Sequence, residues 1–435
     1  VTVSATTDSE INVAAAAVAI AAAFGSTGVG VSIGVSIAEN EIDGLTQAII
    51  TGADARATSG DVTVEARDNA SINALAAAAG LAAGFGSTGI GVSLAGALAF
   101  NRIGSGVSAT IIDSRVHATS LLADEGNVIV TALSEGRVNA LIISASVAIG
   151  VGATGIGVGI GAAYANNMIG HKYSETTTTY TSGDTIGNAV LTKGNTVRVT
   201  EGMNKNRTFE YISDTKLAPN QDNKNSLGES TPDKAINAFD DIPLIGVDYN
   251  NIEQWKEIEI ARQPVEVKAF IENSSINADG DLLVEAKSKQ KIQAATLAVA
   301  AAIAGGSVGI AVSLTGSIVQ NRISTSALAY IDGSGAEGIS ANTITVQADD
   351  DSTINTAAIA ASISLAFGAT GVAISVGVSV AMNTVENDVE AFITNTTDLV
   401  ARGQTNGDGV VVRAGSAEEN TAEPIQVGYY PNDIE

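Results

Sequence analysis

The chain has 435 residues and is apolar without being rich in large side chains: 45% of its residues are hydrophobic, 4% are aromatic and 46 are glycine. Its formal net charge of −25 argues against nucleic-acid binding, because contacts to phosphates need clustered lysine and arginine. The sequence contains no cysteine and only two histidines, His117 and His171, which argues against thiol, disulfide and histidine-dependent chemistry. The acidic charge suits a secreted or surface-exposed protein.

The chain begins at Val1, and residues 1–5 look like the end of a repeat found further on. No charged segment followed by an apolar one opens the chain. We therefore interpret the sequence as a segment of a longer protein.

Five copies of one unit organise the sequence. With Ile11 as the first anchor, the equivalent anchors Ile72, Val138, Ile292 and Ile354 follow at spacings of 61, 66, 154 and 62 residues. Every copy has glycine 14 and 17 residues after its anchor and asparagine 29 residues after it. The glycines are Gly25, Gly28, Gly86, Gly89, Gly152, Gly155, Gly306, Gly309, Gly368 and Gly371, and the asparagines are Asn40, Asn101, Asn167, Asn321 and Asn383. The predicted segments are the end of a preceding repeat (1–10), repeat 1 (11–71), repeat 2 (72–137), the hairpin of repeat 3 (138–170), an inserted small β-module (171–262), the rest of repeat 3 (263–291), repeat 4 (292–353), repeat 5 (354–416) and the start of a further spacer (417–435).

Residue alternation predicts strands in every copy. In residues 29–38, valine and isoleucine alternate with glycine, serine and alanine, and a period of two indicates a β-strand. Each copy is predicted to begin with a β-hairpin whose arms have about 12 to 14 residues and are joined through Gly-x-x-Gly. Two shorter strands follow, as at 107–112 and, after a Gly-Asp or Gly-Asn corner, at 60–66, 126–132 and 280–286. The expected fold is all-β, a β-solenoid-like array or stacked-sheet fibre with a small β insertion.

Neither face of the predicted hairpin carries charge, since one face is valine, isoleucine and leucine and the other is glycine, alanine and serine. Both faces should therefore be covered, because each large apolar side chain gains about 1.5–3 kcal/mol on burial. The small face is expected to approach another sheet closely, and the large face to interdigitate with an equivalent face. Stacking within the chain or between chains is favoured over a membrane-inserting or pore-forming repeat, because soluble segments of about thirty residues separate the arms and aromatic girdles are absent.

The repeated glycines are predicted to serve turns, and the repeated asparagines either to cap an arm or to form a ladder along the solenoid. Acidic turns at 277–281, 349–351 and 406–409 are the candidates for calcium, although solvated turns are the simpler interpretation. No catalytic motif is present in the sequence, so no catalytic residue, resident metal or cofactor is assigned and an enzyme is not expected.

The insertion holds seven of the 17 aromatic residues and three of the six prolines. Two strands are predicted in it, at 194–199 and 208–212. Its layout, with Tyr211, Tyr249 and Trp255 as possible glycan-stacking residues, resembles small chitin- or cellulose-binding modules, in which exposed aromatic rings stack on sugars. The alternative is that Trp255 forms the core of a mini-domain.

The tandem Val-x-Ala-x-Ile, Gly-Asp-x-x-Val-x-Ala and glycine-rich units resemble those of giant bacterial exoproteins, similar to filamentous haemagglutinin and large leukotoxin-type repeat proteins. This resemblance implies export, an extracellular or cell-surface location, and adhesion or matrix formation. We expect a structural or adhesive segment that self-associates into a fibre or stalk. The alternatives are a glycan-binding module carried on a repeat stalk and a membrane-inserting or pore-forming repeat. The expected partners are further copies and surface glycans, without nucleic acid or membrane.

Overall fold

The computed structural model describes residues 1–120, 126–170, 180–181, 185–186, 193–199, 208–213, 242–243, 254–257, 264–403 and 409–415. Within these residues every regular element is a β-strand, which confirms the predicted all-β class. The chain forms two compact units, residues 1–170 with 264–435, and residues 171–263. The second unit is one residue longer than the insertion predicted at 171–262. The described part of the chain contains no helix long and apolar enough to cross a membrane.

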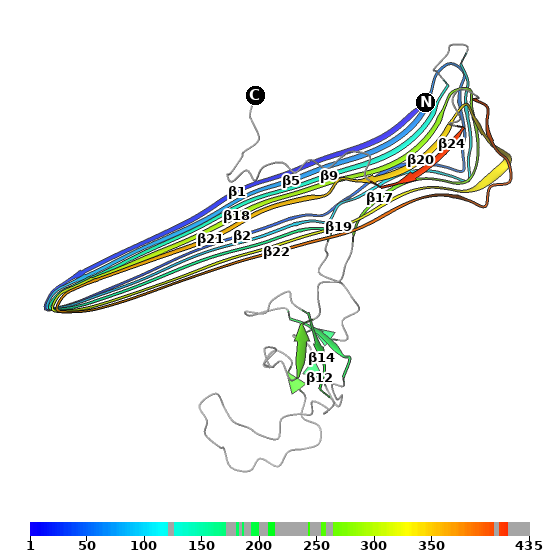
Figure 1. Ribbon diagram of the computed structural model, residues 1–435. Helices are drawn as coiled ribbons and strands as arrows, with labels where there is room; N and C mark the ends of the chain where they lie inside the picture. Colours follow the sequence, from blue (N-terminus) through cyan, green and yellow to red (C-terminus); the bar gives the residue numbers. More distant parts are fainter. Residues whose placement is uncertain are drawn as a thin grey trace, which may run out of the picture. The chain divides into compact units, whose positions relative to one another are not determined.

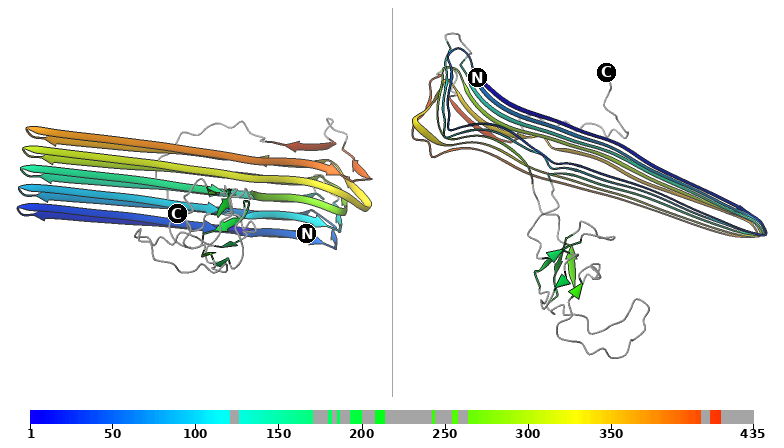
Figure 2. Two further views of the ribbon diagram at one scale, coloured as in Figure 1. Left: turned by 90° about the horizontal axis from the view of Figure 1, so that it is seen from below. Right: turned by 180° about the vertical axis from the view of Figure 1, so that it is seen from behind.

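Two extended sheets make up the first unit (Figures 1 and 2). The first sheet contains β1 (Thr2–Phe24), β5 (Val62–Phe85), β9 (Val128–Val151), β18 (Leu282–Gly305), β20 (Ile344–Asp350), β21 (Thr353–Phe367) and β24 (Val410–Ala414). The second sheet contains β2 (Thr27–Ile42), β3 (Leu45–Thr51), β4 (Asp54–Ala57), β6 (Thr88–Ile103), β7 (Gly106–Ile112), β8 (Arg115–Ala118), β10 (Thr154–Ile169), β17 (Val265–Ala278), β19 (Val308–Ala341), β22 (Thr370–Thr394) and β23 (Leu399–Ala401).

The strands of both sheets pair in parallel, and equivalent residues of successive copies lie opposite one another. The anchors Ile11, Ile72, Val138, Ile292 and Ile354 form one column across the first sheet. The five copies are therefore the rungs of a parallel β-solenoid, stacked within one chain. Figure 2 shows the long arms lying side by side with their tips aligned.

The prediction of a β-hairpin is wrong in one respect, since the two arms of a copy do not pair with each other. In the third copy, β9 belongs to the first sheet and pairs with β5 and β18, whereas β10 belongs to the second sheet and pairs with β6 and β19. Each Gly-x-x-Gly segment is thus a β-arch that carries the chain from one sheet into the facing one. A hairpin and an arch both need two strands and a turn, so alternation alone does not distinguish them.

The shorter strands also differ from the prediction. The strand expected at 107–112 is β7, but those expected at 60–66, 126–132 and 280–286 continue without a break into the next long arm. The result is the 24-residue strands β5, β9 and β18. The four-residue strands β4 and β8 were not predicted.

Every rung has a left-handed backbone position at the same level, directly after β3, β7 and β22 and within β17 and β19. It is occupied by Gly52 (φ 58°), Asp113 (φ 47°), Asn273 (φ 48°), Gly333 (φ 75°) and Asn395 (φ 54°). Glycine, asparagine and aspartate are the residues that tolerate this conformation, so all five copies carry an allowed residue where the solenoid turns its corner.

The half of the solenoid away from the arch tips, here called the base, has a conventional core. Val64, Ile72, Val130, Val284 and Ile292 point between the sheets and are fully buried. The outward residues of the same strands are mostly polar or charged, and Ile129, Leu133 and Leu283 are the apolar ones among them. Burial of the large side chains stabilises this half in the usual way.

The tip half is much thinner, because glycine, alanine and serine make up most of the residues that point between the sheets, with Ile142, Thr296 and Thr315 as larger exceptions. A Cβ atom on Gly91 would lie 2.3 Å from the Ile149 carbonyl oxygen of the facing sheet, and one on Gly157 would lie 2.7 Å from that of Ile303. At the tip, a Cβ on Gly306 would lie 1.8 Å from the Gly152 oxygen of the previous rung. The repeated glycines are thus required by close backbone approach within the arches and between rungs.

Serine hydroxyls are satisfied inside this thin layer. Ser144 donates to the carbonyl oxygen of Ala95 and Ser146 to that of Ser93, both at 2.8 Å across the two sheets. Apart from Ile142, the interior of the tip half is therefore filled without large apolar side chains.

The second unit is a small β-module. Its strands are β11 (Tyr180–Thr181), β12 (Thr185–Ile186), β13 (Thr196–Arg198), β14 (Thr208–Tyr211), β15 (Ile242–Pro243) and β16 (Trp255–Glu257). β11, β13, β14 and β16 form one sheet, and β12 pairs with β15. The two strands predicted in the insertion correspond to β13 and β14.

Candidate functional site: the outer faces of the arms

The polarity of the strands reverses between the base and the tip. In the base half of β9, Val130 points inward and is fully buried, while Arg137 points outward and is exposed. In the tip half of the same strand, Ser146 points inward with 1% exposure, whereas Val151 points outward and is 41% exposed. The large apolar residues of the tip half therefore lie on the outside of the solenoid.

The outer face of the second sheet consists of five columns, each running across five rungs, and is called the second-sheet face. Its columns are Val29, Ile90, Ile156, Ile310 and Val372; Val31, Val92, Val158, Val312 and Ile374; Ile33, Leu94, Ile160, Leu314 and Val376; Val35, Gly96, Ala162, Gly316 and Val378; and Ile37, Leu98, Tyr164, Ile318 and Val380. Even in an inner rung, Leu314 is 40% exposed. This face is open to solvent.

The outer face of the first sheet, called the first-sheet face, is also apolar. In β9 it presents Leu141, Ile143, Ala145, Val147 and Ile149, and the other four rungs present alanine, valine, leucine and isoleucine at the same columns. The large side chains of the arms were predicted to be covered. Within one chain they are not, because the two arms of each copy do not pack through their large faces. Their small faces meet, and both large faces remain outside.

Both faces and the arch tips lack charge over the same depth. The sequence has no charged residue in 11–38, 69–101, 138–170, 292–321 or 352–385. These stretches end on both sheets at about the level of the repeated asparagines. The uncharged zone thus includes both faces of the tip half in all five rungs.

The repeated asparagines form a continuous ladder at this level, which is one of the two roles expected of them. The amide of Asn40 donates to Asn101, Asn101 to Asn167, Asn167 to Asn321 and Asn321 to Asn383, with nitrogen–oxygen distances of 2.7–2.8 Å. Each inner amide both donates and accepts within the ladder. The ladder fixes the register of the rungs and is structural.

Below the ladder, two buried charged groups face different surroundings. Arg102 is 8% exposed and pairs with Glu41 of the neighbouring rung. Asp68 is 2% exposed, and burial raises the pKa of its carboxyl to about 6; the hydroxyl of Ser105 lowers that pKa, and the charge of Asp8 raises it further. Asp68 is thus a buried acid without a cationic partner among the groups that shift its pKa.

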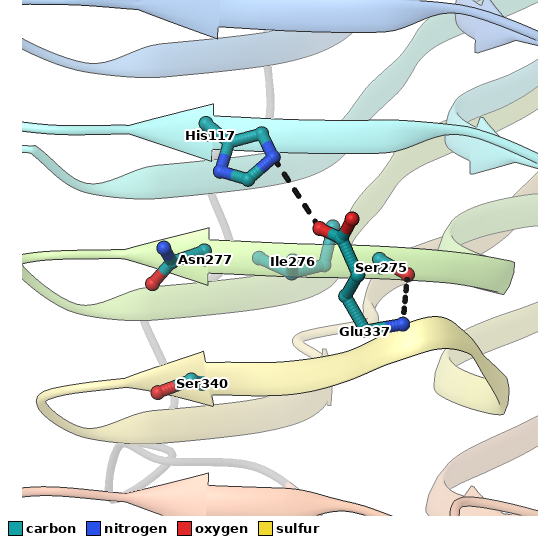
Figure 3. A pocket seen from close by; sticks show the side chains of 6 residues that line it. All are labelled: His117, Ser275, Ile276, Asn277, Glu337 and Ser340. Atoms are coloured by element: carbon teal, nitrogen blue, oxygen red, sulfur yellow. Dashed lines mark hydrogen bonds and ion pairs between the residues drawn. The ribbon is translucent and has the colours of Figure 1, made fainter.

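A shallow pocket in the base is lined by His117, Ser275, Ile276, Asn277, Glu337 and Ser340 (Figure 3). His117 Nε2 lies 3.6 Å from a carboxylate oxygen of Glu337, whose other oxygen is 2.9 Å from Arg115. The backbone N–H of Glu337 donates to the Ser275 hydroxyl at 3.1 Å (Figure 3). These contacts attach the bend in β19 to β8 and β17, so their evident role is to hold that bend.

The calcium candidates are occupied by local hydrogen bonds where they are described. Asp281 accepts from the backbone N–H of Thr343 at 3.0 Å, and Asp350 accepts from the hydroxyl of Thr325 at 2.7 Å. In the described parts of the chain, no three acidic or histidine side chains converge on a possible metal position. The candidate at 406–409 lies outside the described residues except for Gly409.

Two of the three aromatic residues proposed to stack on a glycan, Tyr211 and Trp255, are buried. Tyr211 is 1% and Trp255 is 2% exposed, with their rings in edge contact at a centroid distance of 5.1 Å. Sugar stacking on these two residues is therefore wrong, because neither ring has a free face; they form the core of the module instead. Tyr249 lies outside the described residues.

Comparisons of the chain with family models, curated proteins and solved structures give no match. Functional inference therefore rests on the geometry above. Sequence reasoning identified the glycines, the asparagines and the charge-free arms, but missed that the large residues face outward. The alternation of glycine or serine with valine or isoleucine in residues 28–34 was the available signal, since glycine is needed where backbones meet.

Proposed function

We propose that the chain is a structural segment of a secreted bacterial surface protein, in which stacked arches form a stalk and further copies associate through the outer faces of the arms into a fibre. The observation that carries this proposal is the pair of charge-free faces, rich in valine, isoleucine and leucine, on a solenoid whose interior is complete without them. A scaffold of this kind needs no catalytic group.

The energetics support association in water. Contiguous apolar patches larger than a few hundred Å² are rare on monomeric proteins and mark interaction surfaces. At about 1.5–3 kcal/mol for each large side chain taken from full exposure to full burial, covering one face offers on the order of tens of kcal/mol as an upper bound. The partly exposed side chains here would gain a fraction of that, which is still ample for association.

The extracellular, cell-surface location and the adhesive or matrix-forming role rest on the acidic composition and on the resemblance to giant bacterial exoproteins. The net charge keeps the assembled protein soluble along its charged base. No described residue supports adhesion to a surface glycan.

The test is the association state of the full chain. Sedimentation velocity over a hundredfold range of concentration should show growth from monomer to larger species, and electron microscopy of the concentrated sample should show filaments. A variant with Val147→Asp and Ile160→Asp places one charge on each outer face without touching the interior, and should remain folded and monomeric. A wild-type chain that stays monomeric throughout would contradict the proposal.

A further inference from the structure

Two glycines on the second-sheet face are not explained by the fold. A Cβ on Gly316 would meet no atom within 4 Å, and one on Gly96 would meet only a methyl group of Val35, at 4.0 Å. The inward glycines of the same arms differ, as a Cβ on Gly91 would lie 2.3 Å from backbone oxygen. Glycine weakens a strand, so an outward glycine with free space indicates a place where something outside the fold approaches closely.

These glycines lie at one level and form a groove. Gly96, Ala162 and Gly316 occupy one column across the three inner rungs β6, β10 and β19, and Val35 and Val378 close its two ends. Large side chains flank the groove on both sides. The neighbouring columns carry Leu94, Ile160 and Leu314 on one side and Leu98, Tyr164 and Ile318 on the other.

We propose that the second-sheet face is the contact between two copies of this chain, packed face to face with antiparallel strands. Leu94, Ile160 and Leu314 of one copy would fill the groove of its partner. The same three residues of the partner would fill the groove of the first copy. The two-fold axis runs between the column of Leu94, Ile160 and Leu314 and the column of the groove. It places each column opposite the other in the partner, so the contact is self-complementary and closed. This inference rests on the proposed self-association and assigns one of the two faces to it.

The area is sufficient for a stable dimer. Outward residues lie about 6.6 Å apart along a strand and about 4.8 Å apart between strands. The two-fold axis places four of the five columns opposite one another, so these 20 positions cover about 630 Å². Specific protein–protein interfaces begin at about 600 Å² on each partner. The four columns therefore reach the size of one complete interface and include no charged residue, while the column that starts at Val29 would lie opposite the column of Glu39, Phe100 and Asn166.

The groove favours a protein partner over lipid. Lipid chains conform to any apolar surface and gain from large side chains, so they give no reason for glycine in the middle of a valine- and isoleucine-rich face. A second sheet, in contrast, needs ridges opposite grooves, because two rigid faces pack only when their side chains interdigitate.

The full chain carrying Gly96→Val and Gly316→Val tests this assignment. Valine fits both positions without an internal clash and favours strands, so the fold is retained, as circular dichroism should show. Filling the groove should weaken dimerisation, measured by analytical ultracentrifugation, by at least about tenfold. The matched control, Ala79→Val with Ala145→Val, adds the same side chains to the first-sheet face and should leave the dimerisation constant unchanged.

Other outcomes separate the possible failures. A wild-type chain that never associates removes the proposed function, whereas a chain that associates equally well with the groove filled removes only this interface. Flotation with phosphatidylcholine–phosphatidylglycerol vesicles that is equal or stronger for the glycine variant would make lipid the occupant and overturn the dimer. Should the double variant not fold, Ala162→Leu at the exposed centre of the groove gives the same measurement.

Discussion

The base and the tip half of the solenoid use the same strands with opposite polarity. In the base of β5, Val64 points inward and is fully buried, while Arg67 points outward and is exposed. In the tip half of β5, Ala76 and Ala78 point inward, and Leu81 points outward with 37% exposure. The difference shows that the tip half is held together by backbone pairing and by close packing of the two sheets through small side chains, and not by burial of large residues.

The two halves also divide the tasks of the molecule. The base gains its stability from a conventional core and remains hydrated through its charged outer face. The tip half forms a slab with complete backbone pairing in its inner rungs, and it keeps its large apolar surface available. Substitutions that distinguish an inner from an outer position test this division directly.

The largest expected difference is between two neighbouring residues of β9. Ile142 is fully buried between the sheets, and Ile143 is on the first-sheet face. Ile142→Ala should lower the free energy of unfolding by about 2–5 kcal/mol, since it leaves a cavity that the facing sheet cannot fill. Ile143→Ala should lower it by less than about 1 kcal/mol. Urea unfolding of the two variants at a concentration where the chain is monomeric measures both values, and equal losses would contradict the outward orientation of the arms.

The second comparison sets an inward glycine against an outward one. Gly91→Val should cost about 1–3 kcal/mol or more, because its Cβ would lie 2.3 Å from the Ile149 oxygen and the two sheets would have to separate. Gly96→Val, five residues further along the same strand and on its outer side, should leave the stability of the monomer unchanged or raise it slightly. Thermal unfolding of the two single variants gives the comparison, and a destabilised Gly96→Val would show that the groove is filled by the chain itself.

Much of this fold was predictable from the sequence because the copies are so alike. Five anchors with glycine and asparagine at fixed distances indicated identical units, and alternation indicated strands. Alternation states which residues share a face, but not which face is inside. The usual rule places the larger side chains inward, and only the glycines that meet backbone at Gly91 and Gly157 reverse it.

The sequence also did not show which strand each arm pairs with, because a hairpin and an arch have the same local pattern. The absence of charge on the arms was visible in the sequence, but their exposure was not. The groove required the three-dimensional column that joins Gly96, Ala162 and Gly316 from three separate copies. In the insertion, aromatic residues indicated either a core or a sugar site. Composition could not separate the two, because both need tyrosine and tryptophan.

The asparagine ladder gives a smaller effect that depends on position. Asn167 is fully buried and bonded on both sides, so Asn167→Ala leaves the donor of Asn101 and the acceptor of Asn321 without partners. It should cost about 1–3 kcal/mol. Asn40→Ala, in an outer rung, leaves only one acceptor and should cost clearly less. Chemical denaturation of the two variants tests the gradient, and identical losses would mean that the ladder does not act as a connected chain of hydrogen bonds.

The smallest effect concerns the base and is a dependence on pH. Burial raises the pKa of Asp68 from the ordinary 3.8 to about 6, so the folded chain binds this proton more tightly than the unfolded chain does. Above pH 6 the buried charge lowers stability, and this penalty disappears as the pH falls from about 6 towards 4. Asp68→Asn removes the titration, so the variant should be more stable than the wild type at pH 7.5, and that advantage should shrink at pH 4.5. Melting temperatures at the two pH values measure the change, with Asp113→Asn as the control at an exposed position that does not shift the pKa of Asp68. An advantage that is independent of pH would place the effect in packing rather than in the buried charge.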